Sequence, residues 1–203
     1  MILFIIFSIS LFSLNIEAGK MVLKERGKKV FLSKRVILKE DDIYIEFDKG
    51  FWNKEKGIIS GEGEIYFILK STTSILKGNA EEGFYDENEE KILLKGIKNI
   101  VYNYFVKDST YTFYITGDNL LLFKKSRKVK LEGEVVGIDF EDYVIRGESM
   151  FYDDSKRILR VDPLNNLRKK NNGMEVEGES LIYRIDEEEV FIEGNVSGSI
   201  TLK

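Results

Sequence analysis

The side chains that most often carry out catalysis are either missing from this sequence or placed where they are ordinary. The chain contains neither His nor Cys, which excludes Ser-His-Asp and Cys-His catalysis as well as the usual zinc and copper sites. Acidic clusters remain at Asp41 and Asp42, at Asp153 and Asp154, and at residues 187–189. Each lies at an expected turn or strand end, where acidic side chains are common, so neither carboxylate catalysis nor a calcium site is favoured.

One glycine-rich segment, Gly61-Glu62-Gly63, has the spacing with which some phosphate-binding loops begin. Such a loop needs a helix directly behind it, whose N-terminus binds the phosphate. Residues 65–69, which follow this segment, have the pattern of a strand. The sequence therefore predicts a protein that is not an enzyme and that uses no cofactor or metal.

The apolar residues show where the structural elements lie. Within residues 174–203 they recur at every second position in two runs, separated by the acidic segment 185–189. A period of two is typical of a strand with one buried face, so two strands joined as a hairpin are predicted. Each run contains a glycine after an acid, Gly178 and Gly194, and a glycine within a strand usually marks a bulge or bend. The hairpin is therefore expected to be bent.

The same unit recurs upstream. Gly147 begins the segment GESMFYDD, Gly178 begins GESLIYRI, and a looser copy begins at Gly117, so the copies are 30 and 31 residues apart. Further strands are expected at residues 43–47, 65–69, 100–106 and 111–116, and a loop is expected at residues 164–173. A series of bent hairpins, with one Pro in the whole chain, predicts an all-β stack that is either solenoid-like or a jelly roll.

The first 16 residues contain no charged side chain and are almost wholly apolar. This run is short for a membrane span of about 20 residues but suits the core of a signal peptide. We expect residues 1–18 to be a signal peptide cleaved after Ala18, or an N-terminal anchor if uncleaved. Residues 19–203 are then a single domain of an exported protein.

Charge is distributed unevenly between the two ends of the chain. Residues 20–39 contain eight basic side chains and a single acid, Glu25, whereas residues 174–203 contain eight acids. A nucleic-acid partner is not favoured, because the basic segment is expected to be exported and lacks interleaved aromatics. Solvated strand faces, attraction to an anionic membrane and end-to-end contact between copies all remain open. In the last case residues 196–203 would present an unpaired strand edge, with residues 30–38 as the matching edge.

Three segments carry a family resemblance: FYDEN at residues 84–88, GESMFYD at residues 147–153 and VFIEGNV at residues 190–196. With a polar turn and an alternating strand between such segments, residues 40–203 resemble the OstA-like (LptA/LptC) family of periplasmic lipopolysaccharide-transport proteins. The sequence departs from the family pattern in its basic N-terminal segment and at Pro163, which replaces a glycine. Both the soluble bridge component and the membrane-anchored component of that family therefore remain open as the matching subgroup.

The resemblance implies a twisted open β-jelly roll whose two sheets leave an apolar groove for the acyl chains of lipid A. It also implies a periplasmic protein that carries lipopolysaccharide or a similar amphiphile towards the outer membrane. The implied partners are other OstA-like jelly rolls of a lipid-export system, and copies of this chain joined head to tail. Bent hairpins with one apolar face are compatible with this fold, since an incompletely closed sandwich leaves a slot.

The alternation of apolar residues predicts which side chains face inward, and these are the expected lipid-binding residues. They are Phe113, Ile115, Leu121, Leu131, Val135, Ile145, Phe151, Val176, Ile182, Ile192 and Val196. The alternative is an exported structural or adhesion protein built of β repeats, with a closed core and no lipid ligand. A carbohydrate-binding protein is less favoured, because the only Trp, Trp52, has no acid pair beside it.

Overall fold

The computed structural model describes residues 9–11, 14–106, 109–140, 142–171, 173–187 and 189–199, which form antiparallel strands joined by short turns. The elements are β1 (Ile9–Leu11), β2 (Leu14–Lys24), the 3-10 turn η1 (Glu25–Gly27), β3 (Lys29–Lys39), β4 (Ile43–Asn53), β5 (Ile58–Lys70), β6 (Ser74–Asp86), β7 (Lys91–Lys95), β8 (Lys98–Val106), β9 (Ser109–Thr116), β10 (Asn119–Phe123), β11 (Lys128–Phe140), β12 (Tyr143–Asp153), β13 (Ile158–Val161), β14 (Leu164–Lys169), β15 (Glu175–Glu177), β16 (Ser180–Arg184), β17 (Glu189–Glu193) and β18 (Ser197–Ser199). Within these described ranges, no helix is long and apolar enough to cross a membrane.

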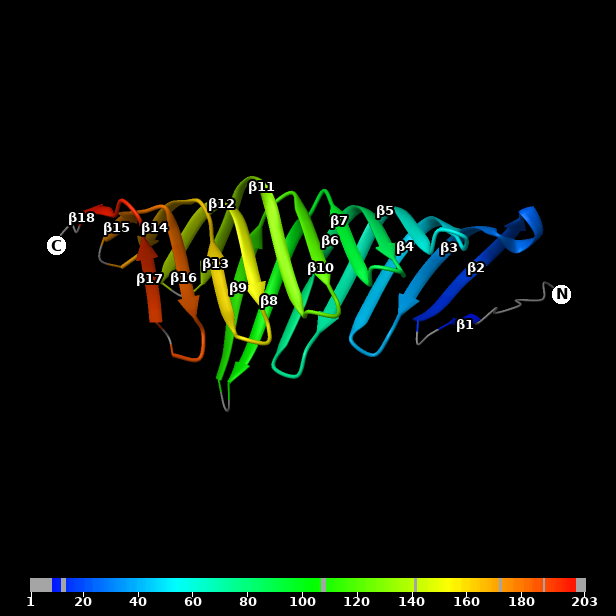
Figure 1. The fold of residues 1–203 in the computed structure, drawn as a ribbon, viewed down its shortest axis with the longest axis horizontal. Helices are drawn as coiled ribbons and strands as arrows, with labels where there is room; N and C mark the ends of the chain where they lie inside the picture. The colour runs from blue at the N-terminus through cyan, green and yellow to red at the C-terminus, as the bar shows by residue number, and fades with distance from the viewer. Residues whose placement is uncertain are drawn as a thin grey trace.

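The strands are stacked broadly in sequence order along one long axis, with β2 at one end of the stack and β17 and β18 at the other (Figure 1). Most strands pair with the strand just before or after them in sequence. Some also pair with the strand one repeat away, as β7 does with β10 and β13 does with β16. Each repeat is therefore in contact chiefly with its neighbours, as in a repeat protein.

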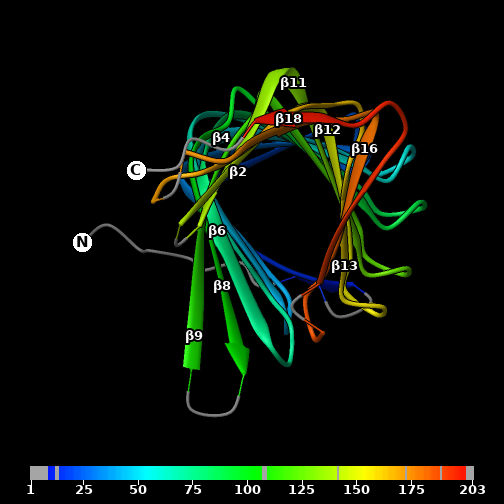
Figure 2. The ribbon, with the colours of Figure 1, turned by 90° about the vertical axis from the view of Figure 1, so that its left-hand side faces the viewer.

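The longest strands bend in the middle and fold the sheet into two layers. Pairing registers shift at these bends, for example between Ser33 and Val36 in β3 and between Glu132 and Val136 in β11. Small residues allow the close approach, since a Cβ on Gly61 would lie 2.9 Å from Cγ of Phe47. The first layer contains β7, β10, β13, β16 and β17, the second layer contains β8, β9, β14, β15 and β18, and the bent strands contribute to both. Viewed along the long axis, the layers meet where β11 and β12 cross over and spread apart toward the ends of β9 and β13 (Figure 2).

The turns at the edge of the first layer repeat with nearly the same geometry. Gly57, Glu90, Arg127 and Arg157 occupy the same place in successive turns, and all four have a positive φ between 51° and 63°. Backbone hydrogen bonds join each turn to the next, as from Glu87 N to Gly57 O (2.8 Å), and from Asp154 N to Arg127 O (3.0 Å). The repeat predicted from sequence is therefore present in the backbone as a row of hydrogen-bonded turns.

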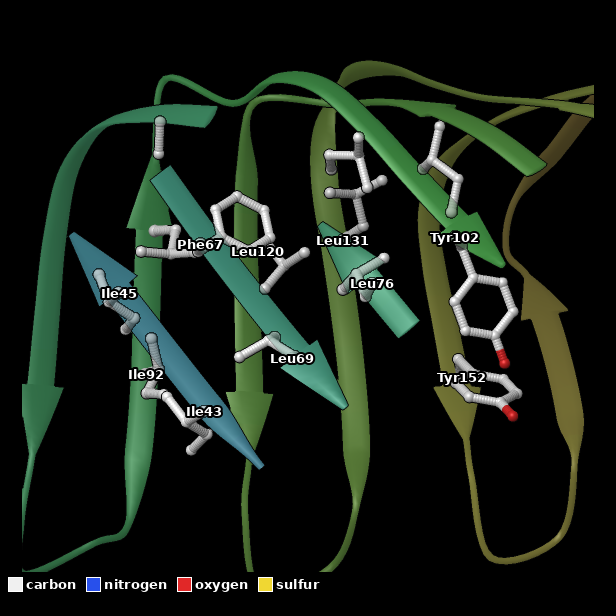
Figure 3. Packing of buried hydrophobic residues seen from close by; sticks show 14 of the residues in the cluster. Ile43, Ile45, Phe67, Leu69, Leu76, Ile92, Tyr102, Leu120, Leu131 and Tyr152 are labelled. Atoms are coloured by element: carbon white, nitrogen blue, oxygen red, sulfur yellow. The ribbon is translucent and has the colours of Figure 1, made fainter. Parts of the chain in front are cut away.

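The hydrophobic core lies between the two layers. Figure 3 shows Ile43 and Phe67 of the second layer opposite Ile92 and Leu120 of the first, and each of these side chains is at most 5% exposed. Burial of this apolar surface stabilises the fold by about 25 cal/mol per Å². The protein is thus all-β, a twisted open β-jelly roll built from repeated bent hairpins, as the sequence predicted.

The prediction of a loop at residues 164–173 was wrong for residues 164–169, whereas residues 170 and 171 form a turn. Residues 164–169 form β14, which pairs with β12 and β15. The pattern was missed because the register shifts between Arg146 and Gly147 of β12, which places the buried residues Leu164 and Leu167 three positions apart. A bulge of this kind breaks the alternation by which strands are recognised.

Both ends of the stack differ in detail from the sequence prediction. The first edge of the sheet was expected at residues 30–38, but β2 pairs with β3 along its length and covers that edge. β2 crosses the expected cleavage point after Ala18, and its residues Leu14 and Ile16 are buried. At the other end, β18 pairs with β15, and residues 200–203 of the expected terminal strand lie outside the described residues.

Candidate functional site

A cavity of about 100 Å³ lies between the two layers, on the side where the turns of both layers lie. Its inner wall is almost entirely apolar. The second layer contributes Ile43, Leu69, Leu76, Tyr102, Phe113, Ile115 and Ile138, and the first layer contributes Leu122, Val129, Met150, Tyr152, Leu159 and Ile185.

The outer rim of this cavity is polar and charged. Asp42, Ser71 and Lys70 come from turns or strand ends of the second layer, and Arg127 and Asp154 come from turns of the first. An apolar wall with a polar rim suits a ligand that is hydrocarbon at one end and polar at the other.

Polar contacts connect the turns of the two layers across this side of the molecule, and we call them the crossing contacts. Lys124 Nζ donates a hydrogen bond to the carboxylate of Glu40. Burial is the largest single effect and lowers the pKa of Lys124, but the hydrogen bonds and charges of Glu40 and Tyr85 together outweigh it, so the net pKa is raised. Next along the axis, Ser71 Oγ donates to Asp154 Oδ1 at 3.3 Å.

A third crossing contact involves Tyr104 of β8. Its hydroxyl donates to Asp186 Oδ1 at 2.8 Å and accepts a hydrogen bond from Arg157 Nη1, also at 2.8 Å. Burial, followed by the bond to Asp186, raises the pKa of Tyr104 to about 12. The hydrogen bond from Arg157 lowers the pKa of Asp186, so that its carboxylate stays charged.

Two tyrosines bring polar atoms into the apolar cavity. Tyr102 of β8 and Tyr152 of β12 face each other from opposite layers (Figure 3), with ring centroids 5.5 Å apart in an edge-on arrangement. The hydroxyl of Tyr152 donates to Asp154 Oδ1 at 3.2 Å. The hydroxyl of Tyr102 is buried and has no hydrogen-bond partner. Burial raises the pKa of both phenols, so both remain protonated at neutral pH.

The predicted lipid-binding residues fall into distinct groups in the structure. Phe113 and Ile115 line the cavity. Leu131 and Ile145 are buried in the core outside the cavity wall. Ile192 is partly buried and packs against the core, and Val176 is partly buried beside Leu167.

The inward orientation predicted for Leu121, Phe151 and Ile182 was wrong. Each is partly exposed, and its strand neighbours point inward instead: Leu120 beside Leu121, Met150 and Tyr152 beside Phe151, and Leu181 and Tyr183 beside Ile182. The cause is the bend in each repeat, which changes the inward positions from odd to even or the reverse. A single alternation carried across a bend therefore assigns one half of the strand to the wrong face.

Two predicted residues remain. Val196 lies between β17 and β18 and is 53% exposed, so its predicted inward position was also wrong. The side chain of Val135 lies outside those that the structure describes. The neighbouring residue Val136, past the register shift in β11, is buried.

Sequence reasoning missed several residues of the cavity wall, above all Tyr102, Leu122, Met150 and Tyr152. Tyr152 recurs in the repeat, since Tyr183 occupies the same position in the next copy. A usable signal was present, because Tyr152 directly precedes the acidic turn at Asp153 and Asp154.

The acidic pair Asp153 and Asp154 takes part in the structure of its own turn and of the cavity rim. Asp153 Oδ1 accepts hydrogen bonds from the backbone and the hydroxyl of Ser155, at 3.1 and 2.6 Å, and so fixes its turn. Asp154 lies at the cavity rim, where its carboxylate accepts hydrogen bonds from Ser71 and Tyr152. Among the residues that the structure describes, no group of three or more acids is placed to bind a metal ion.

Comparison with known proteins gives little beyond this geometry. No protein-family model and no curated protein matches the sequence. Among solved structures, one match is LptH of Pseudomonas aeruginosa, described as the LptA homologous periplasmic component of the conserved lipopolysaccharide transport device. It is 11% identical, with a TM-score of 0.45, and the match covers 59% of this chain and 82% of that one. A likeness at this level supports no argument about function.

Proposed function

We propose that the protein is a periplasmic carrier of lipopolysaccharide, whose acyl chains enter the cavity between the two layers. The observation that supports it is the cavity itself, with its apolar wall and its charged rim on the side where the layers spread apart. Transfer of an acyl chain into such a wall is favourable by about 0.8 kcal/mol per methylene. Binding therefore needs no specific chemistry at the head group, as is appropriate for a carrier.

The size of the cavity limits what it accepts without rearrangement. At about 100 Å³ it is smaller than the roughly 150 Å³ cavity that admits benzene in another protein. It therefore receives a segment of one chain, and a larger lipid requires the two layers to separate further. The crossing contacts join side chains and turns only, so they can part without breaking any strand pairing.

The proposed carrier works with other jelly rolls of its kind, or with copies of itself, joined end to end. Within the described residues, no strand pairs with the outer side of residues 20–24 of β2 or with the outer side of β17. The segment around β2 is basic and that around β17 is acidic. Unpaired edges with opposite charge favour head-to-tail contact, which continues the sheet from one molecule to the next.

Photo-crosslinking in cells tests the carrier function. Leu122 lines the cavity, whereas Leu121, its neighbour in β10, points away from it. A photoreactive residue at 122 should capture lipopolysaccharide, and the same residue at 121 should not. Equal labelling at both positions would contradict a lipid site between the layers. Labelling at neither, with no lipid in the purified protein, would favour the exported structural or adhesion protein.

A further inference from the structure

The hydroxyl of Tyr102 is an unusual feature of the cavity wall. The side chain is 8% exposed and its hydroxyl finds no partner in the protein. Burial raises the pKa of Tyr102, and weak hydrogen-bonding contacts with Tyr152 and Ser74 offset part of this rise, but neither neighbour meets the hydroxyl at full hydrogen-bond geometry. A buried polar group left unpaired costs roughly 1–3 kcal/mol, so native structures rarely retain one without a reason.

The neighbouring hydroxyls are already engaged elsewhere. The hydroxyl of Ser74 makes a 2.8 Å hydrogen bond with that of Ser71, and Tyr152 donates to Asp154. The remaining surroundings are hydrocarbon, with the ring of Phe113 centred 5.5 Å from that of Tyr102 and Leu76 and Met150 in the same wall. The oxygen atoms of both hydroxyls could still accept a hydrogen bond, but neither lies at hydrogen-bond geometry with the Tyr102 O–H, so a ligand in the cavity is the source from which a well-placed acceptor can come.

We propose that the Tyr102 hydroxyl donates a hydrogen bond to the carbonyl oxygen of an acyl ligand, and so selects acyl chains over plain hydrocarbon. This inference rests on the proposed function, since it assumes that a chain enters the cavity. An ester, an amide and a free fatty acid all offer this oxygen. The cavity lining carries both signs of charge, with Lys70, Lys124 and Arg127 beside Asp42 and Asp154, so the charges do not choose between these ligands and the experiment below distinguishes them.

The chain offers a matched control in the same strand. Tyr104 is two residues from Tyr102 in β8, is also buried, and lies outside the cavity wall. Its hydroxyl has two partners, Asp186 and Arg157. Tyr104→Phe therefore removes a paired hydroxyl, whereas Tyr102→Phe removes an unpaired one.

The experiment measures displacement of an apolar fluorescent dye from the full chain by methyl dodecanoate, dodecanoic acid and dodecane. The unaltered protein should prefer the ester to the alkane. Tyr102→Phe should weaken binding of the ester by about three- to tenfold, which corresponds to the loss of one hydrogen bond, and should leave the affinity for dodecane unchanged. Its thermal midpoint should stay the same or rise, because no protein hydrogen bond is lost. Tyr104→Phe should lower the midpoint and leave the ligand preference intact.

The outcomes separate this inference from the carrier function. Dye displacement by ester and alkane alike, unaffected by Tyr102→Phe, would overturn the carbonyl contact and leave lipid carriage standing. Failure of all three ligands to displace the dye would overturn both. A midpoint that falls as far in Tyr102→Phe as in Tyr104→Phe would also overturn the inference, because the hydroxyl would then have a protein partner. Binding of dodecanoic acid at least as tight as that of its ester supports the carbonyl contact and assigns it to free fatty acids.

Discussion

Lys124 donates a hydrogen bond to Glu40 across the gap between the two layers, although 84 residues separate them in sequence. Both side chains are largely buried, at 14% and 13% exposed. Lys124 lies in the turn between β10 and β11 and Glu40 in the turn between β3 and β4. Their contact therefore links distant repeats at the edge of the cavity.

Lys124→Met should both destabilise the protein and speed the entry of ligand. It leaves a buried carboxylate without its cation, for which a loss of about 1–3 kcal/mol in the free energy of unfolding is expected. Chemical denaturation measures the loss, and stopped-flow mixing with an apolar dye measures the entry rate. Lys125→Met is the control, because Lys125 is 77% exposed and, within the part of the chain that the structure describes, forms its ion pair with Glu90 of the same layer. A change of similar size in both variants would contradict a role for the crossing contact.

The assignment of faces in β16 can be tested with two neighbouring residues. Leu181 is fully buried, whereas Ile182 is partly exposed on the outer face. Leu181→Ala should cost about 2–5 kcal/mol of unfolding free energy, as is usual for a core leucine. Ile182→Ala should cost much less. Urea denaturation of both variants measures these losses. A larger loss in Ile182→Ala than in Leu181→Ala would show that Ile182 faces inward, as the sequence alone predicted.

Acid should weaken the contact between Tyr104, Arg157 and Asp186. Because Arg157 lowers the pKa of Asp186 in the folded state, this carboxylate stabilises the fold above its ordinary pKa of 3.8. That contribution is lost as the pH falls through the lowered folded-state value. Asp186→Asn should therefore reduce the free energy of unfolding at neutral pH. It should also reduce the amount of that free energy which is lost between about pH 6 and pH 2.

A suitable control for Asp186→Asn is Asp162→Asn. Asp162 is equally exposed and pairs with Arg160, only two residues away in sequence, so it joins no separate layers. Thermal midpoints across the same pH range should differ clearly between the two variants. Identical pH profiles would show that the Asp186 contact does not link the layers in solution.

Assembly through the strand edges should depend on charge and on salt. Reversing charge in β17 with Glu189→Lys and Glu193→Lys places basic residues against the basic edge at β2, so head-to-tail growth should be suppressed. Light scattering at rising protein concentration measures this growth, which should also weaken at about 1 M salt, where the Debye length is near 3 Å. Growth unaffected by either change would exclude an electrostatic contact between these ends.

The fold was largely predictable because its signals are local. Alternation identified β4, β8 and the hairpin of β16 and β17, and the spacing of Gly117, Gly147 and Gly178 revealed the repeat. The cavity was harder to predict, since the inward face changes at each bend and no single residue marks the exact point of the change. The position of Lys124 opposite Glu40 could not be predicted at all. It depends on the offset between the turns of the two layers, and that offset is set by the twist that adds up over several strands.

The row of hydrogen-bonded turns along the first layer has a consequence for the length of the molecule. The backbone of each turn bonds to the turn before it and to the turn after it, as from Lys124 N to Glu90 O (3.0 Å) and from Ile185 N to Arg157 O (3.1 Å). An extra repeat inserted between two turns would find, on each side, the same backbone N–H and C=O groups that had bonded to each other before. Natural or engineered duplication of about one repeat should therefore lengthen the protein while its cross-section stays constant, and folding can spread from any stable unit to those beside it.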